Sequence, residues 1–234
     1  MKNFTIVIPV FNEEKNIIPL LTEIEINLKN YLSNFEVLIV NDCSTDKSAD
    51  LLKKKSHLFP FQIKILNNKL NSGQSSTILN GIKNAENNTI VTIDGDGQNN
   101  PKDIIKLIDI YNASNDVFLV GGIRKIRKDS YVKIISSKLA NFVRKKILKD
   151  DCEDTGCSLK VFDRGIFLNF PFFDGIHRFL PALFKWFGYK TVFVNVDHRE
   201  RIHGQSKYGT LKRLYKGVFD MLKVLKILKE NKND

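Results

Sequence analysis

Residues 89–104, TIVTIDGDGQNNPKDI, decide the fold prediction, because an apolar run passes directly into acidic residues and then into the start of a helix. The run that ends at Asp94 is rich in β-branched residues and is typical of a buried strand. Asn100 and Pro101 are typical of the first positions of a helix. The segment therefore predicts one strand–loop–helix unit of an α/β protein, with Asp94 and Asp96 in the loop.

Similar units lie on both sides of this segment. The predicted strands are short apolar runs that cover residues 4–10, 35–42, 61–66, 88–94 and 117–122. Helices are predicted between them, at residues 12–28, 44–55, 74–85 and 100–111. We expect Asn12 to cap the first helix, with Glu13 and Glu14 in its first turn. This alternation predicts a doubly wound, mostly parallel sheet, whose ligands bind beyond the carboxyl ends of the strands.

The pattern changes after Gly122. A basic amphipathic helix is predicted over residues 130–149, and a second one over the tail, 210–230. Residues 157–163 and 190–200 are predicted to be further strands. No internal repeat, linker or low-complexity segment interrupts the chain.

Composition places the protein in the globular class. Hydrophobic residues make up 42% and charged residues 27% of the 234 residues, which favours a folded domain over a disordered chain. We expect neither a signal peptide nor a membrane-spanning run, and the three cysteines form no zinc or disulfide pattern. The net charge of +11 predicts a negatively charged partner, and nucleic acid, anionic lipid and a phosphorylated substrate all qualify.

The two aspartates that end the fourth predicted strand suggest a metal site. Alternate side chains of an extended chain share a face, so Asp94 and Asp96 can point toward one ion, while Gly95 lets the backbone turn. Carboxylate oxygens suit Mg²⁺ or Mn²⁺, and Gln98 adds a neutral oxygen. The alternative is that these residues only cap the following helix.

Several motifs together resemble glycosyltransferase family 2, whose nucleotide-sugar-binding fold is called GT-A. In chain order, the motifs that carry the likeness are IVIPVFNEEKNI (6–17), VLIVNDCSTDKS (37–48), NSGQSSTILNGI (71–82) and IDGDGQNNP (93–101). Later motifs are similar to dolichol-phosphate mannose synthases and their bacterial polyprenyl-phosphate relatives, namely DTGCSLKVF (154–162), HRFLPAL (177–183) and RIHGQSKYG (201–209). The resemblance extends to about residue 210 and implies a catalytic domain over 1–209. Within that domain it implies a nucleotide-sugar half, 1–123, and an acceptor half, 124–209.

The resemblance implies roles for individual residues. The donor-binding positions are Pro9, Phe11, Asn12, Glu13, Asp42, Asp46, Gly73, Gln74, Asp94 and Gly95, with Gln74 standing where a basic residue is often found. The metal ligands are Asp94, Asp96 and Gln98, which would hold Mg²⁺ or Mn²⁺. The catalytic positions are Asp96, Arg124, Asp154, Arg201 and Lys207. The acceptor-binding positions are Arg124, Lys133, Ser137, His177, Arg178 and Ser206.

The implied reaction is inverting transfer of a hexose from a nucleotide diphosphate sugar, such as GDP-mannose or a UDP-sugar, to a polyprenyl phosphate. A phosphate acceptor is already anionic at neutral pH and needs cations to bind it rather than a base. Arg124, Arg127, Lys133 and Arg178 supply such cations. The alternative is a hydroxyl acceptor in polysaccharide synthesis, with Glu153 or Asp154 as general base, but we favour an ordering role for Asp154.

We expect the protein to lie in the cytoplasm at the inner face of the membrane. The tail at 210–234 mixes leucines with lysines, so it can bind the membrane surface or a small membrane-protein partner, or it can pack on the domain core. A non-enzymatic nucleic-acid-binding protein is a distant alternative, since it leaves the paired aspartates unexplained. A Rossmann dehydrogenase is disfavoured because no G-x-G-x-x-G follows the first strand.

Overall fold

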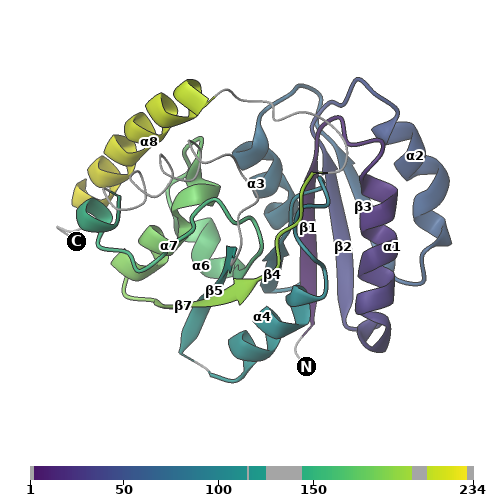
Figure 1. The fold of residues 1–234 in the computed structure, drawn as a ribbon, viewed down its shortest axis with the longest axis horizontal. Helices are drawn as coiled ribbons and strands as arrows, with labels where there is room; N and C mark the ends of the chain where they lie inside the picture. Colours follow the sequence, from purple (N-terminus) through teal and green to yellow (C-terminus); the bar gives the residue numbers. More distant parts are fainter. Residues whose placement is uncertain (1–2, 115, 125–143, 202–209, 231–234) are drawn as a thin grey trace.

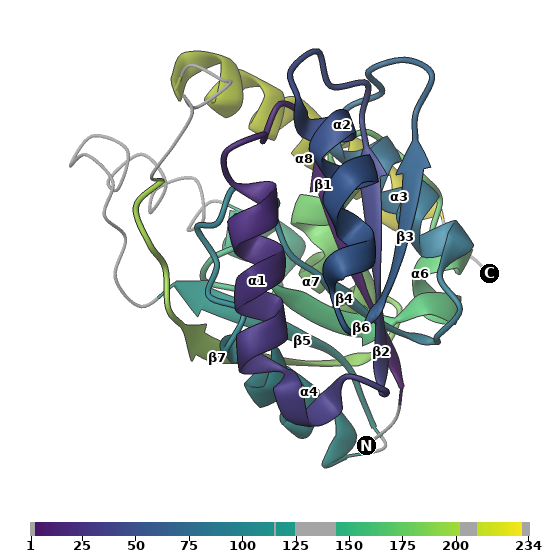
Figure 2. The ribbon, with the colours of Figure 1, turned by 90° about the vertical axis from the view of Figure 1, so that its right-hand side faces the viewer.

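In the part of the chain that the structure describes, seven strands form one sheet between two layers of helices, so the protein is a three-layer α/β domain (Figures 1 and 2). The computed structural model describes residues 3–114, 116–124, 144–201 and 210–230. The strands are β1 (Phe4–Val10), β2 (Phe35–Asn41), β3 (Gln62–Asn67), β4 (Thr89–Thr92), β5 (Val117–Arg124), β6 (Lys160–Asp163) and β7 (Lys190–Val196). The helices are α1 (Ile17–Asn27), α2 (Ser48–Lys55), α3 (Gln74–Asn84), α4 (Asp103–Asn112), α6 (Arg164–Asn169), α7 (Ile176–Trp186) and α8 (Thr210–Glu230). Two short 3₁₀ turns, at Lys29–Tyr31 and Ser56–Leu58, and a helical turn at 144–148 complete the elements.

The strand order β3-β2-β1-β4-β6-β5-β7 confirms the mostly parallel sheet that the sequence predicts. β6 runs antiparallel to both of its neighbours, β4 and β5, and every other pair of adjacent strands is parallel. The carboxyl ends of β1, β2, β4, β5 and β7 therefore lie along one edge of the sheet. The start of β6 lies at the same edge, because Lys160 is opposite Thr92, the last residue of β4.

The core divides into two apolar clusters, one on each face of the sheet. Helices α1, α2 and α4 cover the first cluster, and α3, α6, α7 and α8 cover the second. Strand β1 serves both, because Ile6 and Ile8 face the first cluster while Val7 faces the second. Such two-sided burial explains why β1 and β2 are mostly apolar, whereas β3 and β7 are partly exposed and carry more polar residues.

The expected start of the first helix is wrong. Helix α1 begins at Ile17, and Asn12 lies before it with a left-handed backbone, φ 56°. The Asn12 side chain is engaged elsewhere, since its amide oxygen accepts a hydrogen bond from the Thr45 N–H at 2.8 Å. Glu13 and Glu14 consequently lie in the loop and not in the first helical turn.

Of the two predicted basic helices, the structure describes the tail helix and only a small part of the earlier one. Most of residues 130–149 lies outside the described residues, and only 144–148 is seen as a helical turn. The tail helix is confirmed as α8, whose contacts include α7 (Figure 1). Val224 and Leu228 of α8 are buried in the second cluster together with Leu148, so the face of α8 that carries them packs on the domain.

Candidate active site at the carboxyl edge of the sheet

The predicted site residues gather where the parallel strands end. Glu13 follows β1, Asp42 follows β2, and Asp94 and Asp96 follow β4. Arg124 is the last residue of β5. The edge therefore brings acidic groups from the first half of the chain next to cationic groups from the second half.

Two loops at this edge are tied together by polar side chains. The Asp46 carboxylate accepts hydrogen bonds from the Glu14 N–H at 3.0 Å and from the Ser48 N–H at 2.9 Å. Burial raises the pKa of Asp46, but the hydrogen bonds from Ser48 and Glu14 outweigh it, so the pKa lies below its usual value. Asn12 adds a second tie through Thr45. These contacts hold the β1–α1 loop against the β2–α2 loop, which forms one wall of the site.

Asp42 organises the loop that leads into α3. Its carboxylate accepts hydrogen bonds from the Ser72 N–H and the Gly73 N–H, both at 2.9 Å, and from the Asn68 amide at 2.8 Å. Burial raises the pKa of Asp42, but the hydrogen bonds from Ser72 and Asn68 outweigh this effect and lower it. Asp42 is almost fully buried, and its carboxylate holds the loop before α3 through these hydrogen bonds.

Gln74 contacts the acidic pair directly. Gly73 adopts φ 80°, a left-handed conformation that favours glycine, and Gln74 begins α3 immediately after it. The Gln74 amide donates a hydrogen bond to Asp94 Oδ1 at 2.8 Å. Gly95, the residue after Asp94, lies close to the end of β1. A Cβ at Gly95 would lie 3.1 Å from the Pro9 carbonyl oxygen. The group that holds Asp94 from α3 is therefore a neutral amide.

Asp94 is the strongly perturbed acid of the site. Burial and the neighbouring negative charge of Asp96 raise its pKa to about 6. Its N–H donates to Ser158 Oγ at 3.2 Å, and that hydroxyl donates to Asn99 Oδ1 at 2.7 Å. The buried ammonium of Lys160 partly offsets the rise in the Asp94 pKa. Neither Ser158 nor Lys160 was identified from the sequence, because their place beside Asp94 depends on the pairing of β6 with β4.

Arg201 reaches Asp96 from the segment after β7. Its Nη2 donates a short hydrogen bond to Asp96 Oδ2, and its Nη1 lies 4.0 Å from Glu13 Oε1. The backbone of this segment is fixed, because the Arg199 N–H donates to the Gln98 carbonyl at 2.9 Å. The Gln98 side-chain nitrogen in turn donates to the Arg199 carbonyl at 3.3 Å. The segment after β7 is therefore joined to the loop that carries the two aspartates.

Arg124 and Asp154 form a second cation–carboxylate pair. Arg124 Nε donates to Asp154 Oδ2 at 2.6 Å, and Nη2 donates to Oδ1 at 2.7 Å. Asp154 is buried. Glu153, by contrast, has a side chain that is 68% exposed and lies 3.7 Å from Lys145. The two acids of this loop therefore occupy quite different surroundings.

His177 and Arg178, at the start of α7, face different neighbours. His177 Nδ1 lies 2.7 Å from Ser75 Oγ on α3. Arg178 Nη2 donates a short hydrogen bond to Asp220 on α8. Lys133, Ser137, Ser206 and Lys207, together with Arg127, lie outside the described residues.

The donor set fits a divalent cation that is shared with a substrate. In the ranges 3–114, 116–124, 144–201 and 210–230, no three His, Cys, Asp or Glu side chains converge as a complete protein cage. Asp94 and Asp96 instead offer two carboxylates at one strand end. Mg²⁺ is commonly held in this way, by one or two carboxylates together with substrate phosphates and water.

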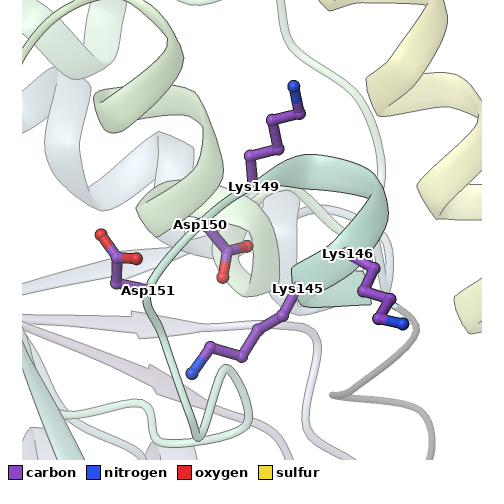
Figure 3. Close-up of a pocket in the computed structure, with 5 residues that line it drawn as sticks. All are labelled: Lys145, Lys146, Lys149, Asp150 and Asp151. Carbon is purple, nitrogen blue, oxygen red and sulfur yellow. The ribbon is translucent and has the colours of Figure 1, made fainter.

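A separate open hollow lies at the end of the 144–148 turn. Its volume is about 490 Å³, and it is lined by Lys145, Lys146, Lys149, Asp150 and Asp151. The three lysine side chains point in different directions, so their charges do not converge on one point (Figure 3). Asp150 and Asp151 are already paired, with Arg144 and Lys185 respectively. The hollow contains none of the predicted site residues and is a mixed-charge surface.

Comparison with known proteins places these features in a family. The model of the family described as Glycosyl transferase family 2 matches residues 5–169. An undecaprenyl-phosphate 4-deoxy-4-formamido-L-arabinose transferase from Aeromonas hydrophila is 32% identical over 212 residues, which are 90% of this chain and 64% of that protein. A dodecaprenyl-phosphate galacturonate synthase from Rhizobium johnstonii is 32% identical over 227 residues, which are 94% of this chain and 66% of that protein. The chain thus spans about two thirds of the length of these relatives.

The fold is shared with solved nucleotide-sugar enzymes. Glucosyl-3-phosphoglycerate synthase from Mycobacterium tuberculosis, crystallised with Mn²⁺, UDP and glucosyl-3-phosphoglycerate, superposes with a TM-score of 0.71 at 15% identity. The match covers 94% of this chain and 78% of that one. At this level of identity the likeness shows the fold alone, and it confirms the GT-A class expected from the sequence.

Proposed function

The chain belongs to glycosyl transferase family 2, and on that basis we propose that it transfers a sugar, with inversion, from a nucleotide diphosphate sugar to a polyprenyl phosphate. The relatives named above act, according to their names, on undecaprenyl phosphate and dodecaprenyl phosphate. Residues 1–123 would bind the nucleotide sugar and residues 124–209 the acceptor, within one shared sheet.

The Arg124–Asp154 pair is the observation that favours a phosphate acceptor. A hydroxyl acceptor must lose a proton to a general base, whereas a lipid phosphate attacks as an anion. Both Asp154 oxygens accept hydrogen bonds from the Arg124 guanidinium, so this carboxylate is already engaged with a cation. Asp154 therefore orders Arg124 in the proposed reaction, and Arg124 binds the acceptor phosphate.

The acidic pair would serve the donor. Asp94 and Asp96 would hold Mg²⁺ or Mn²⁺, which supplies positive charge to a departing diphosphate. Gln74 orients the Asp94 carboxylate through its amide. The loops fixed by Asp42 and Asp46 would form the walls of the nucleotide site. Arg201, which lies at the same acidic pair, would add a further positive charge on the donor side.

The proposed location is the inner face of the membrane. None of the described helices has both the length and the apolar character needed to cross a bilayer. The outward face of α8 nevertheless exposes Phe219 by 50% and Leu222 by 55%, and it exposes Lys223, Lys226 and Lys229 nearby. Such a mixed face suits the headgroup region of an anionic bilayer. The net charge of +11 would then serve lipid and phosphate groups rather than nucleic acid.

Ligand-induced stabilisation tests the donor side. Thermal unfolding is measured with Mn²⁺ and a panel of nucleotide sugars. The panel contains GDP-mannose, UDP-glucose, UDP-N-acetylhexosamine, and nucleotide-linked forms of 4-deoxy-4-formamido-L-arabinose and galacturonate, the sugars in the names of the relatives. We expect at least one nucleotide sugar to raise the melting temperature in a Mn²⁺-dependent way, and Asp96→Ala to abolish the effect. If no member of the panel raises the melting temperature, the proposed donor class is wrong.

Product analysis tests the acceptor. Incubation with the stabilising nucleotide sugar and a polyprenyl phosphate should yield a lipid-linked phosphosugar that mild acid cleaves. Transfer to a glycan or lipid hydroxyl, with no acid-labile lipid product, would instead support the hydroxyl-acceptor reaction. Flotation with liposomes that contain anionic lipid tests the location, and absence of binding would argue against direct docking.

A further inference from the structure

Arg201 lies on the carboxylate that is proposed to bind the metal ion. Asp96 is only 8% exposed, and its Oδ2 accepts a short hydrogen bond from Arg201 Nη2. The second Asp96 oxygen accepts a hydrogen bond from the Gln98 N–H at 3.1 Å. The Arg201 side chain is 22% exposed, so solvent screens this pair only in part.

Arg201 supplies positive charge beside the acidic pair. Its guanidinium contacts Asp96 and Glu13, and the negative charge of Asp94 also acts on it. The amide that holds Asp94, from Gln74, carries no charge. The nearby guanidinium of Arg124 is bound at two points to Asp154. Arg201 is therefore the principal counter-ion of Asp96 among the described residues.

Asp96 Oδ2 cannot bind the Arg201 guanidinium and a divalent cation together without strong repulsion between the two cations. A divalent ion on Asp96 Oδ2 would lie within a few ångströms of the guanidinium, and two positive charges at that distance repel strongly in a partly buried site. The backbone of Arg201 need not move for the side chain to leave. Its segment is held to the loop at 98–99 by the Arg199–Gln98 backbone hydrogen bond and by the bridge between Asn99 and His198.

We propose that Arg201 is the resident counter-ion of Asp96 and that it exchanges with the divalent cation. On metal binding the guanidinium rotates away from Asp96 and becomes available to the anionic diphosphate that arrives with the ion. This inference rests on the proposed function for the identity of the anion, but the exchange itself concerns only Arg201, Asp96 and the metal. Arg201 thus weakens binding of the metal ion alone, and it strengthens binding of the metal ion together with the nucleotide.

The exchange predicts that Arg201→Ala strengthens the binding of Mn²⁺ alone and weakens the binding of the nucleotide sugar. Mn²⁺ binding to the protein without nucleotide is measured from the electron paramagnetic resonance signal of free Mn²⁺. We expect Arg201→Ala to bind Mn²⁺ about 10-fold more tightly than the unsubstituted protein, because the competing charge is gone. Arg201→Lys, which keeps the charge, should bind Mn²⁺ nearly as the unsubstituted protein does. With Mn²⁺ saturating, Arg201→Ala should bind the stabilising nucleotide sugar about 10-fold more weakly.

Arg199→Ala is the matched control. Arg199 lies two residues away, has the same side chain and forms a two-point pair with Glu23 at 2.8 and 2.7 Å, away from the acidic corner. Its removal should leave Mn²⁺ affinity unchanged. A tighter Mn²⁺ affinity in Arg199→Ala as well would indicate a general charge effect and would overturn the exchange.

The outcomes separate this inference from the proposed function. If Arg201→Ala binds Mn²⁺ equally or more weakly than the unsubstituted protein, the exchange is wrong, even where a nucleotide sugar still stabilises the protein with Mn²⁺. If Arg201→Ala binds Mn²⁺ more tightly but no nucleotide sugar binds any form, the exchange stands and the proposed function fails. Undetectable Mn²⁺ binding by both forms also overturns the exchange, since removal of Arg201 should expose the site.

Discussion

Arg124 and Asp154, 30 residues apart, meet at two points, with Nε and Nη2 of the arginine donating to separate carboxylate oxygens at 2.6 and 2.7 Å. The Arg124 N–H also donates to Asp154 Oδ2, at 3.2 Å. The geometry joins the end of β5 to the loop before β6. In the proposed reaction, Asp154 would therefore order Arg124 and would not accept a proton from the acceptor.

Asp154→Asn is expected to lower both stability and activity. The substitution leaves the Arg124 guanidinium without its counter-charge, and loss of one partner of a buried pair costs about 3 kcal/mol. Chemical denaturation should show a reduced free energy of unfolding, and sugar transfer should fall in parallel. Glu153→Gln is the control and should keep both properties, because Glu153 is exposed. Loss of activity at unchanged stability in Asp154→Asn would favour a general base instead.

Asp42→Asn is expected to destabilise the protein at neutral pH by about 2 kcal/mol, since the loop before α3 loses a charged acceptor of several hydrogen bonds. The pKa of Asp42 is lowered in the folded state, so the folded protein binds this proton more weakly than the unfolded chain does. Its contribution is therefore complete above the unfolded value of 3.8 and is lost as the pH falls below it. The difference between the denaturation midpoints of the two forms should be constant from pH 7 to about pH 4 and should shrink as the pH falls further. A difference independent of pH would contradict the assignment.

Asp94 should make the stability of the folded protein depend on pH in the opposite sense to Asp42. Its pKa is raised to about 6, so the folded protein holds this proton more tightly than the unfolded chain, and stability without metal falls as the pH rises from about 4 to about 6. Asp94→Asn removes this dependence and should gain stability relative to the unsubstituted protein across that range. A divalent ion needs the ionised carboxylate, so Mn²⁺ affinity should weaken below pH 6. Calorimetric Mn²⁺ titrations at pH 5 and pH 7 check the second effect, and equal affinities at both values would refute it.

Asp220→Asn is expected to loosen α8. Asp220 is buried and paired with the partly exposed Arg178, so its loss should cost about 2 kcal/mol. Hydrogen exchange at the amides of α8 should become faster, while exchange in β1 and β2 stays slow. Glu230→Gln breaks only the exposed pair with Lys226 and should leave exchange in the rest of α8 unchanged. Equal exchange in Asp220→Asn and the unsubstituted protein would mean that apolar contacts alone hold the helix.

Local patterns predicted the parallel part of the fold well. The run that ends at Asp94 is apolar because β4 is covered on both faces, and β1 and β2 follow the same rule. The position of the acidic residues at the strand ends followed from the direction of parallel strands alone. The start of α1 was wrong because Asn12 uses its amide for the neighbouring loop, a contact 33 residues away that no local signal reveals.

Long-range contacts account for what the sequence did not predict. Ser158 and Lys160 reach Asp94 only because β6 pairs with β4. Arg201 was expected at the site from the family resemblance, but its contact with Asp96, across 105 residues, was not predicted. The apolar stripe of α8 was predicted, but an amphipathic pattern does not say whether protein or lipid covers it. Here the domain covers Val224 and Leu228, while Phe219 and Leu222 stay exposed.

Strand β6 sets an order on the assembly of the sheet during synthesis. It lies between β4 and β5, yet it is made 36 residues after the end of β5 at Arg124, at Lys160. A nascent chain that has emerged only as far as β5 has nothing to join that strand to the β1–β4 sheet. The corner that carries Asp94 and Arg124 can close only after residues 160–163 have left the ribosome, and β7 pairs with β5 later still.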